Sequence, residues 1–404
     1  MQPFDSAEVQ FDLADSGTVA PSTNGTHHPS EGDRVAARRA DIDVKQEQVG
    51  KVLEAMGCEA ALLLMPAHVT WFTAGMNVRG LIADSERPGV YTNGRQRWLL
   101  CSNADSQRLF DEELDRLGFQ LKEWNWEGGR ADLLMSITAG KKLAADRPFP
   151  GTQQVAERLR PLVRVLSDIE REDYRALGAR VTHAVEATAR TVQPGMTEEE
   201  IAGHVGHRLL HRGAEPAAIS VTADDRGARF RRAGFTAAAV RRTCTIQATA
   251  QRGGLYATAG RAVCFGEPPE DFRKGYERAL RLSALFRAAS VPGGTMKTAR
   301  ERAARVVEGT SHEFDGRLAP PGFGTGRFPA EELRRAGHDE PFVAGQPLVW
   351  QPRLGPAAVV DTVVVAPDGP ECVTPPTAWP FKRVTIAGVP HDIPDVLVRP
   401  APGA

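Results

Sequence analysis

The sequence has few of the features that mark disulfide-bonded, membrane-spanning or nucleic-acid-binding proteins. Its five cysteines are odd in number and widely spaced, with no C-x-x-C pair, which argues against a disulfide framework or a zinc knuckle. No run approaches the roughly 20 apolar residues that span a bilayer. The 50 basic and 51 acidic residues nearly cancel, so we expect neither nucleic acid nor a membrane as a partner. The N-terminal MQPFDSAEVQ lacks a signal-peptide pattern, and with reduced thiols this predicts a cytoplasmic protein.

What the chain does contain is the composition of a globular protein with more than one core. It has 404 residues, of which 41% are hydrophobic and 25% are charged. A chain of this length exceeds one ordinary core, so we expect two domains. Residues 1–33 are polar and without periodicity, which predicts a disordered tail. Residues 34–165 alternate helical segments with short apolar runs such as Ala60–Met65, the pattern of an α/β domain.

A second domain is expected over residues 166–394. It contains two units of the same form: a helix, a Pro-Gly pair, a threonine and another helix. The pairs are Pro194-Gly195 and Pro292-Gly293, and strand-like, β-branched sequence follows each unit. This recurrence predicts an internally duplicated domain. The last residues, 395–404, have the character of a second tail.

Within this domain, one stretch has the frame of a two-metal hydrolase strand pair without its carboxylates. Gly254, Arg261 and Gly266 occupy the fixed positions of the pattern D-x-G-x4-G-Y-x-x-D-x-x-R-x4-G. The two aspartates of that pattern fall on Gln247 and Thr258. A neutral amide or hydroxyl lacks the anionic charge that a bridged pair of divalent ions requires. The frame is present, and its first two metal ligands are not.

Further motifs in a fixed order extend the frame to a family resemblance. They are Pro194-Gly195-Met196-Thr197-Glu198, Gly322–Gly326, and Trp350-Gln351-Pro352 followed by Asp361-Thr362-Val363-Val364-Val365. The last is similar to an "E-P-G … E-D-T" ending. Together these motifs resemble the family of methionine aminopeptidase, aminopeptidase P, prolidase and creatinase over most of the chain. The resemblance implies an α/β (α+β) fold, with a creatinase-type N-terminal domain before a duplicated pita-bread domain, and a homodimer.

Position by position, the metal ligands that this resemblance implies are missing. The family's two-metal members use two aspartates, one histidine and two glutamates. The histidine position falls on Phe323, and the glutamate positions fall on Gln351 and Val360. No histidine lies between His312 and His338, so a shift of register does not supply one. We therefore expect no metal and no other cofactor.

Three arginines are further candidates for a ligand pocket. Creatinase-like relatives use a histidine ahead of the first aspartate, but segment 221–240 contains none and places Phe230 to Arg232 there. Arginine is too basic to shuttle protons, so Arg232 either binds a carboxylate or phosphate or belongs to a solvated strand edge. Arg261 either orders the strand pair or contacts the ligand. The resemblance places Arg79 on a loop that approaches the partner's pocket in creatinase-type dimers.

Two classes of function follow from these observations. The first is a family member with a degenerate, metal-free site, which binds a small amino-acid-like or peptide ligand or serves as an interaction module. The second is an Xaa-Pro peptidase-like or creatinase-like hydrolase of a C–N bond in a peptide or a small amide or guanidino compound. The sequence leaves both open, because no residue emerges as the catalyst of the second.

Overall fold

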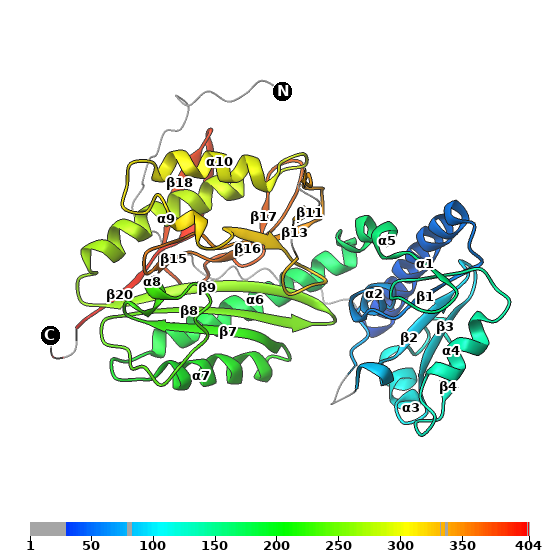
Figure 1. Ribbon diagram of the computed structural model, residues 1–404. Helices are drawn as coiled ribbons and strands as arrows, with labels where there is room; N and C mark the ends of the chain where they lie inside the picture. Colours follow the sequence, from blue (N-terminus) through cyan, green and yellow to red (C-terminus); the bar gives the residue numbers. More distant parts are fainter. Residues whose placement is uncertain (1–29, 79–82, 332, 336–337, 402, 404) are drawn as a thin grey trace. The chain divides into compact units, whose positions relative to one another are not determined.

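Figure 1 shows the computed structural model of the protein, which describes residues 30–78, 83–331, 333–335, 338–401 and 403. Contacts between residues divide the chain into two compact units. Of the described residues, the smaller unit comprises those from 30 to 171 with 252–255, and the larger comprises those from 172 to 251 and from 256 to 403. The division falls at Arg171, inside a helix, and not after residue 165 as expected. None of the described helices is long and apolar enough to cross a membrane.

The smaller unit is an α/β domain built on one mixed sheet, whose strands lie in the order β4-β3-β2-β1-β5-β6. The apolar run at Ala60 forms β1 in the middle of this sheet, where all of its residues are buried, as expected. The strands are β1 Ala60–Leu63, β2 Gly89–Thr92, β3 Arg97–Ser102, β4 Gln120–Trp124, β5 Leu143–Ala145 and β6 Thr152–Gln154. The helices are α1 Glu31–Met56, α2 Pro66–Phe72, α3 Ser106–Arg108, α4 Ala131–Thr138 and α5 Ala156–Val163.

Helix α1 corrects the predicted end of the N-terminal tail. The Oγ atom of Ser30 accepts the N–H of Asp33, and the carboxylate of Asp33 accepts the N–H of Ser30. This capping box starts the helix at Glu31, so the tail predicted through residue 33 is wrong for its last residues. Residues 1–29 of that prediction lie outside the described residues.

The larger unit contains two four-stranded sheets and the helices that pack on them. The first sheet has the order β20-β9-β8-β7 and the second the order β10-β13-β16-β17. The strands of these sheets are β7 Glu215–Ala223, β8 Thr243–Arg252, β9 Leu255–Phe265, β10 Gly322–Gly324, β13 Pro347–Trp350, β16 Asp361–Val364, β17 Glu371–Cys372 and β20 Leu397–Arg399. Short hairpins use β11 Arg334–Arg335, β12 His338–Asp339, β14 Arg353–Leu354, β15 Ala357–Ala358, β18 Phe381–Ile386 and β19 Val389–Pro394.

The repeated helix pairs of the sequence form α6 Asp168–Thr191 with α7 Glu198–His211, and α9 Glu270–Ala288 with α10 Met296–Val307. In each pair a threonine caps the second helix: Thr197 accepts the N–H of Glu200, and Thr295 accepts that of Thr298. Figure 1 shows α7 along the sheet of β7, β8 and β9, while α9 and α10 lie beyond β15 and β16. A short helix, α8 Arg226–Arg229, follows β7.

The predicted tail from residue 395 is wrong, because this segment adds a strand to the first sheet. Strand β20 pairs in parallel with β9, with Leu397 opposite Val263 and Arg399 opposite Phe265. The carbonyl of Arg399 also accepts the N–H of Gly266 at 2.8 Å. A strand at the edge of a sheet bonds on one side only, so three residues between loops carry too little periodicity to reveal it.

Candidate functional site

The predicted strand-pair site lies where the two sheets of the larger unit meet. Gly260 in β9 donates its N–H to the carbonyl of Val360 at 2.9 Å, which forms an isolated bridge between the sheets. A Cβ atom at Gly260 would lie 2.8 Å from the Cβ of Val360. Any side chain at this position would therefore push the two strands apart. This close approach brings the predicted positions of β8, β9 and β13 next to one another.

Gln247 and Gln351 meet across this junction, although 104 residues separate them in the chain. The Nε2 of Gln247 donates to the Oε1 of Gln351 at 3.4 Å. The Nε2 of Gln351 donates in turn to the carbonyl of Pro320 at 3.3 Å. Both glutamines are half-buried. The structure thus brings together the positions that the resemblance assigned to the first aspartate and the first glutamate.

Thr258 is held by hydroxyl groups from two neighbouring strands. It is fully buried, and its Oγ1 lies 2.8 Å from that of Thr249 in β8. Its N–H donates to the Oγ1 of Thr362 at 2.9 Å, and that hydroxyl donates to the carbonyl of Thr258 at 2.7 Å. Neutral hydrogen bonds therefore fill the place where the family pattern has a carboxylate.

Phe323 and Val360 supply apolar groups to the same region. Phe323 in β10 pairs with Val349 of β13, and both lie on the face opposite to Trp350 because side chains alternate along a strand. Trp350 stacks on Phe286 of α9, with ring centroids 4.6 Å apart, on the other side of the sheet. Phe323 is half-buried, and Val360 is fully buried.

The chemistry of these five side chains does not fit a two-metal centre. Two amides, one hydroxyl, one phenyl ring and one isopropyl group provide no anionic ligand and no imidazole. Throughout the described part of the chain, no three histidine, cysteine, aspartate or glutamate side chains are grouped so that they could hold a metal ion.

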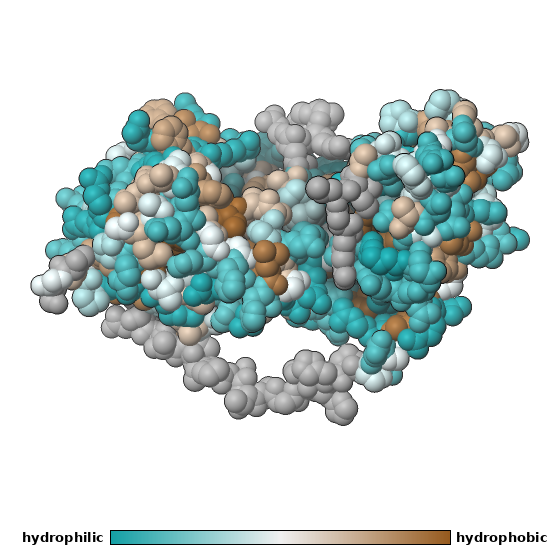
Figure 2. Space-filling model, turned by 90° about the horizontal axis from the view of Figure 1, so that it is seen from below, coloured by the Kyte–Doolittle hydropathy of each residue, from teal (hydrophilic) through white to brown (hydrophobic). Residues whose placement is uncertain are grey.

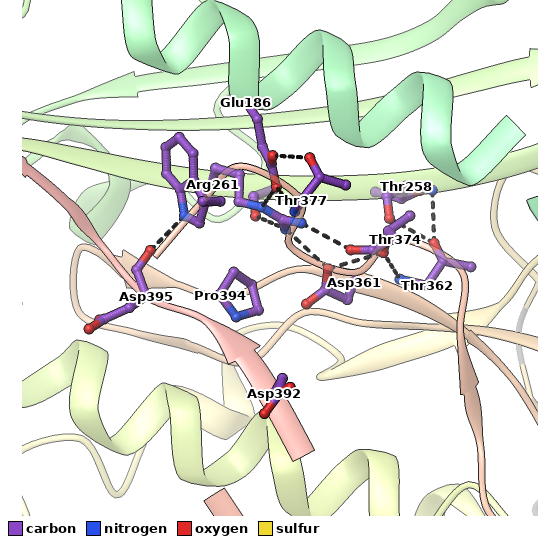
Figure 3. Close-up of polar contacts among 12 residues, drawn as sticks. Glu186, Thr258, Arg261, Asp361, Thr362, Thr374, Thr377, Asp392, Pro394 and Asp395 are labelled. Carbon is purple, nitrogen blue, oxygen red and sulfur yellow. Dashed lines mark hydrogen bonds and ion pairs between the residues drawn. The ribbon is translucent and has the colours of Figure 1, made fainter. Parts of the chain in front are cut away.

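Arg261 lies on the opposite face of β9, inside a buried ionic network (Figure 3). Its Nε donates to Glu186 of α6 at 3.0 Å, and its Nη1 donates to Asp361 of β16 at 3.1 Å. Its Nη2 donates to the carbonyl of Thr374 at 2.9 Å. Burial alone would lower the pKa of Arg261, but the carboxylates of Asp361 and Glu186 outweigh burial and raise it.

Both carboxylates of this network have further partners. Asp361 also accepts from Nη2 of Arg287 at 2.6 Å and from the hydroxyl of Thr374 at 3.0 Å. Glu186 also accepts from the hydroxyl of Thr377 at 2.6 Å. Of the two interpretations of Arg261, the geometry favours the structural one, because its donors tie α6 to β16 and none of these bonds reaches the face of Gln247.

The candidate arginines ahead of β8 are placed differently from one another. Arg232 is exposed, whereas Arg231 is half-buried and donates from Nη2 to Asp315 at 2.6 Å and from Nη1 to the carbonyl of Gly355 at 3.2 Å. Of these two neighbours it is therefore Arg231 that turns inward and lines the cavity described below. Arg79 lies outside the described residues.

A cavity of about 810 Å³ opens beside this site, within the larger unit. Its wall includes Phe286, Ala303, Pro321 and Gln351, and two arginines, Arg231 and Arg353. The sequence analysis did not single out Arg353. A signal was present, because Arg353 follows Gln351-Pro352 and so occupies the glycine position of the E-P-G motif.

Comparisons with known proteins agree with this architecture. Residues 172–365 match the model of metallopeptidase family M24, and no curated protein matches the chain in sequence. A prolidase from Pyrococcus horikoshii OT3 has a similar fold, with a TM-score of 0.70 and 17% identity, over 82% of this chain and 98% of that one. Dipeptidase PepE from Mycobacterium ulcerans gives a TM-score of 0.69 and 17% identity, over 93% and 100% of the two chains. An X-Pro aminopeptidase from Thermotoga maritima MSB8 gives 0.69 and 16%, over 88% and 99%.

At these identities the likeness to the solved structures concerns the fold alone. It confirms the expected fold class, an α/β chain that contains a pita-bread domain.

Proposed function

Because residues 172–365 match the model of metallopeptidase family M24, we propose that the protein is a member of this family whose site works without metal and binds a small amino-acid-like or peptide ligand. The observation that carries this proposal is the set of side chains at the five ligand positions. They are Gln247, Thr258, Phe323, Gln351 and Val360. Neutral hydrogen bonds join the polar ones to neighbouring groups, as at Gln247 with Gln351 and Thr258 with Thr249.

The groups that line the cavity suit a small organic ligand. Gln351 lines the cavity, and its amide offers both a donor and an acceptor to a peptide-like group. Phe286, which lies on the side of the second sheet opposite to Phe323, and Pro321 add apolar surface to the cavity. A cavity of about 810 Å³ has the size of sites that hold small molecules or short peptides.

The alternative proposal is hydrolysis of a C–N bond, which needs an activated nucleophile or a general base. Burial raises the pKa of the thiol of Cys244 in β8, so this group stays protonated and unreactive. Asp315 of the cavity wall has a histidine partner behind it, with Nδ1 of His312 3.2 Å from its Oδ2. However, His312 is buried, and Asp315 already accepts from Arg231 and from the N–H of Gly355. These contacts favour the binding function.

The purified protein is expected to carry no stoichiometric Mn, Co, Zn or Fe, and to cleave no Xaa-Pro dipeptide when these ions are added. An Ala-Pro dipeptide at about 100 times its Kd should raise the free energy of unfolding by about 2.7 kcal/mol. Metal analysis, a peptidase assay and thermal unfolding make these measurements. Gln351→Ala should weaken dipeptide binding about tenfold, the effect of losing one hydrogen bond to a ligand, while the exposed control Gln154→Ala should not.

Stoichiometric metal with metal-dependent cleavage would overturn the proposal. Steady turnover in the absence of metal would instead support the hydrolase. If the protein holds no metal, cleaves no dipeptide and shows no thermal shift with the dipeptide, the remaining role is that of an interaction module.

We also propose a cytoplasmic homodimer. On the face seen in Figure 2, apolar residues occur as separate small groups among hydrophilic ones. The large apolar side chains that the larger unit exposes include Phe230, Phe235, Phe314 and Leu318. Scattered residues of this kind are ordinary on a surface, so they support no broad docking face for other proteins, and the homodimer is proposed from the family resemblance alone. Light scattering coupled to size-exclusion chromatography should give twice the chain mass of 43.7 kDa, and a single chain mass would contradict the dimer.

A further inference from the structure

The cavity beside the site has charged groups at two depths. At its rim, exposed basic and acidic side chains alternate, among them Lys297, Arg300, Arg317, Glu301, Glu308 and Glu313. Solvent and salt screen such groups, so they select weakly among ligands. The charges that can select are those of the inner wall, which are partly removed from water.

On the inner wall, Arg231 and Asp315 neutralise each other. Their Nη2 and Oδ1 atoms are 2.6 Å apart, and both side chains are half-buried. Asp339 is another half-buried acidic group of the wall, and it forms no ion pair with Arg353.

Arg353 is the basic group of the inner wall that remains uncompensated. It lies in β14, it is half-buried, and its Nη1 is buried without a hydrogen-bond partner among the described residues. That nitrogen lies 3.1 Å from the position that a Cβ on Gly227 in α8 would take. Nη1 has therefore lost water without gaining an acceptor from the described residues. Buried polar groups of this kind call for a partner that the chain alone does not supply.

The charge of Arg353 persists despite burial. Burial, and then the neighbouring charge of Arg231, lower the pKa of Arg353 to about 10. At neutral pH the guanidinium is therefore still protonated. Among the described residues, Asp315 pairs with Arg231, and no carboxylate is found in an ion pair with Arg353.

We propose that Arg353 binds the oxyanion of a small ligand, a carboxylate or a phosphate, inside this cavity. The inference rests on the proposed function, because it names the charged end of the ligand that this site would take. A guanidinium presents two parallel N–H groups to two oxygens, the geometry of its strongest bonds to such groups. Gln351 lies two residues before Arg353 and lines the same cavity, so a ligand held at Arg353 also reaches the glutamine face.

Replacing Arg353 with methionine gives a test in which binding and stability move in opposite directions. Methionine keeps much of the volume and removes the charge. N-acetylglycine and inorganic phosphate serve as probes in isothermal titration calorimetry, with neutral N-acetylglycinamide as the uncharged match. We expect saturable binding of at least one anion by the wild type and a loss of at least about tenfold in the variant. Without ligand, the variant should melt at a higher temperature than the wild type, because an unpaired buried charge has been removed.

Two further variants keep the test decisive. Arg353→Lys retains the charge without the planar fork, so its anion affinity should fall between those of the wild type and Arg353→Met. Arg229→Met removes an exposed arginine that is not part of the cavity wall, and it should change neither anion affinity nor melting temperature. The two anions distinguish a carboxylate ligand from a phosphate ligand.

Three outcomes would overturn the inference: no saturable binding of either anion, unchanged affinity of the anion that binds in Arg353→Met, or, where N-acetylglycine is the only anion that binds, equal affinity for it and its amide. Binding of Ala-Pro that is equally tight in the wild type and in Arg353→Met would leave the proposed function standing and refute the role of Arg353. Anion binding that depends on Arg353, in a protein that binds no dipeptide, would support the role of Arg353 and refute dipeptide binding as the proposed function.

Discussion

Replacing Arg261 with methionine is expected to lower the free energy of unfolding by about 3–5 kcal/mol, the usual cost of removing one partner from a buried ion pair. The variant leaves Glu186 and Asp361, both fully buried, without the guanidinium that bridges them. Arg287 still contacts Asp361 at 2.6 Å, so the larger loss falls on Glu186. The bridge joins α6 to β16, and its loss therefore weakens the packing of the larger unit as a whole.

Urea unfolding followed by circular dichroism measures this effect. Arg273→Met is the matched control, because Arg273 is exposed on α9 and pairs with Glu277 one turn away. Exposed pairs contribute about 0–1 kcal/mol. If the two variants lose similar free energy of unfolding, the network does not stabilise the fold, and the result would favour Arg261 as a ligand contact.

The second large effect is a loss of stability in acid that depends on His391. This residue lies in β19 opposite Val384 of β18, and only 8% of it is exposed. Burial, followed by the charge of Arg287, lowers the pKa of His391 to about 4, although Asp392 opposes the shift. Its Nε2 is buried without a partner among the described residues. The folded protein therefore holds this histidine neutral.

The sign of the pH effect follows from proton binding. An unfolded histidine titrates near about 6.5, so below that pH the unfolded state takes up a proton that the folded state refuses. The contribution of neutral His391 is fully present above pH 6.5 and is lost as the pH falls toward 4. The difference between the two pKa values corresponds to about 3 kcal/mol.

His391→Phe keeps a ring of similar size and removes the titration. Because every other group titrates alike in both proteins, the difference in unfolding free energy between wild type and variant isolates His391. That difference should shift in favour of the variant by about 3 kcal/mol between pH 7 and pH 4, as measured by urea unfolding at each pH. A difference that stays constant with pH would show that His391 is accessible to protons in the folded state.

Much of the fold could be predicted from local patterns in the sequence. The run at Ala60 forms a central buried strand, and the two Pro-Gly units form helix pairs with capped second helices. Such signals lie within a few residues of one another, and turn or cap chemistry reveals them directly. Strand β20 was missed for the opposite reason, because its partner β9 is more than a hundred residues away in the chain.

Only part of the candidate site could be predicted from the sequence. The spacing from Gly254 to Gly266 placed Gln247 and Thr258 correctly on neighbouring strands, since glycines at turns fix the register of the strands they join. Which arginine of the segment Phe230 to Arg232 turns inward could not be predicted, because neighbouring residues in a loop point in directions that no periodicity sets.

By itself the sequence determined the spacing pattern of this protein and which residue types occupy its positions, because such patterns depend on residues that are close together in the chain. Only the tertiary structure decided what each of these residues meets. It joined Gln247 to Gln351, enclosed Arg261 between Glu186 and Asp361, and left Arg353 without a partner beside the cavity. These relations depend on how two sheets and their helices pack, and packing between distant segments follows from the whole chain rather than from any part of it.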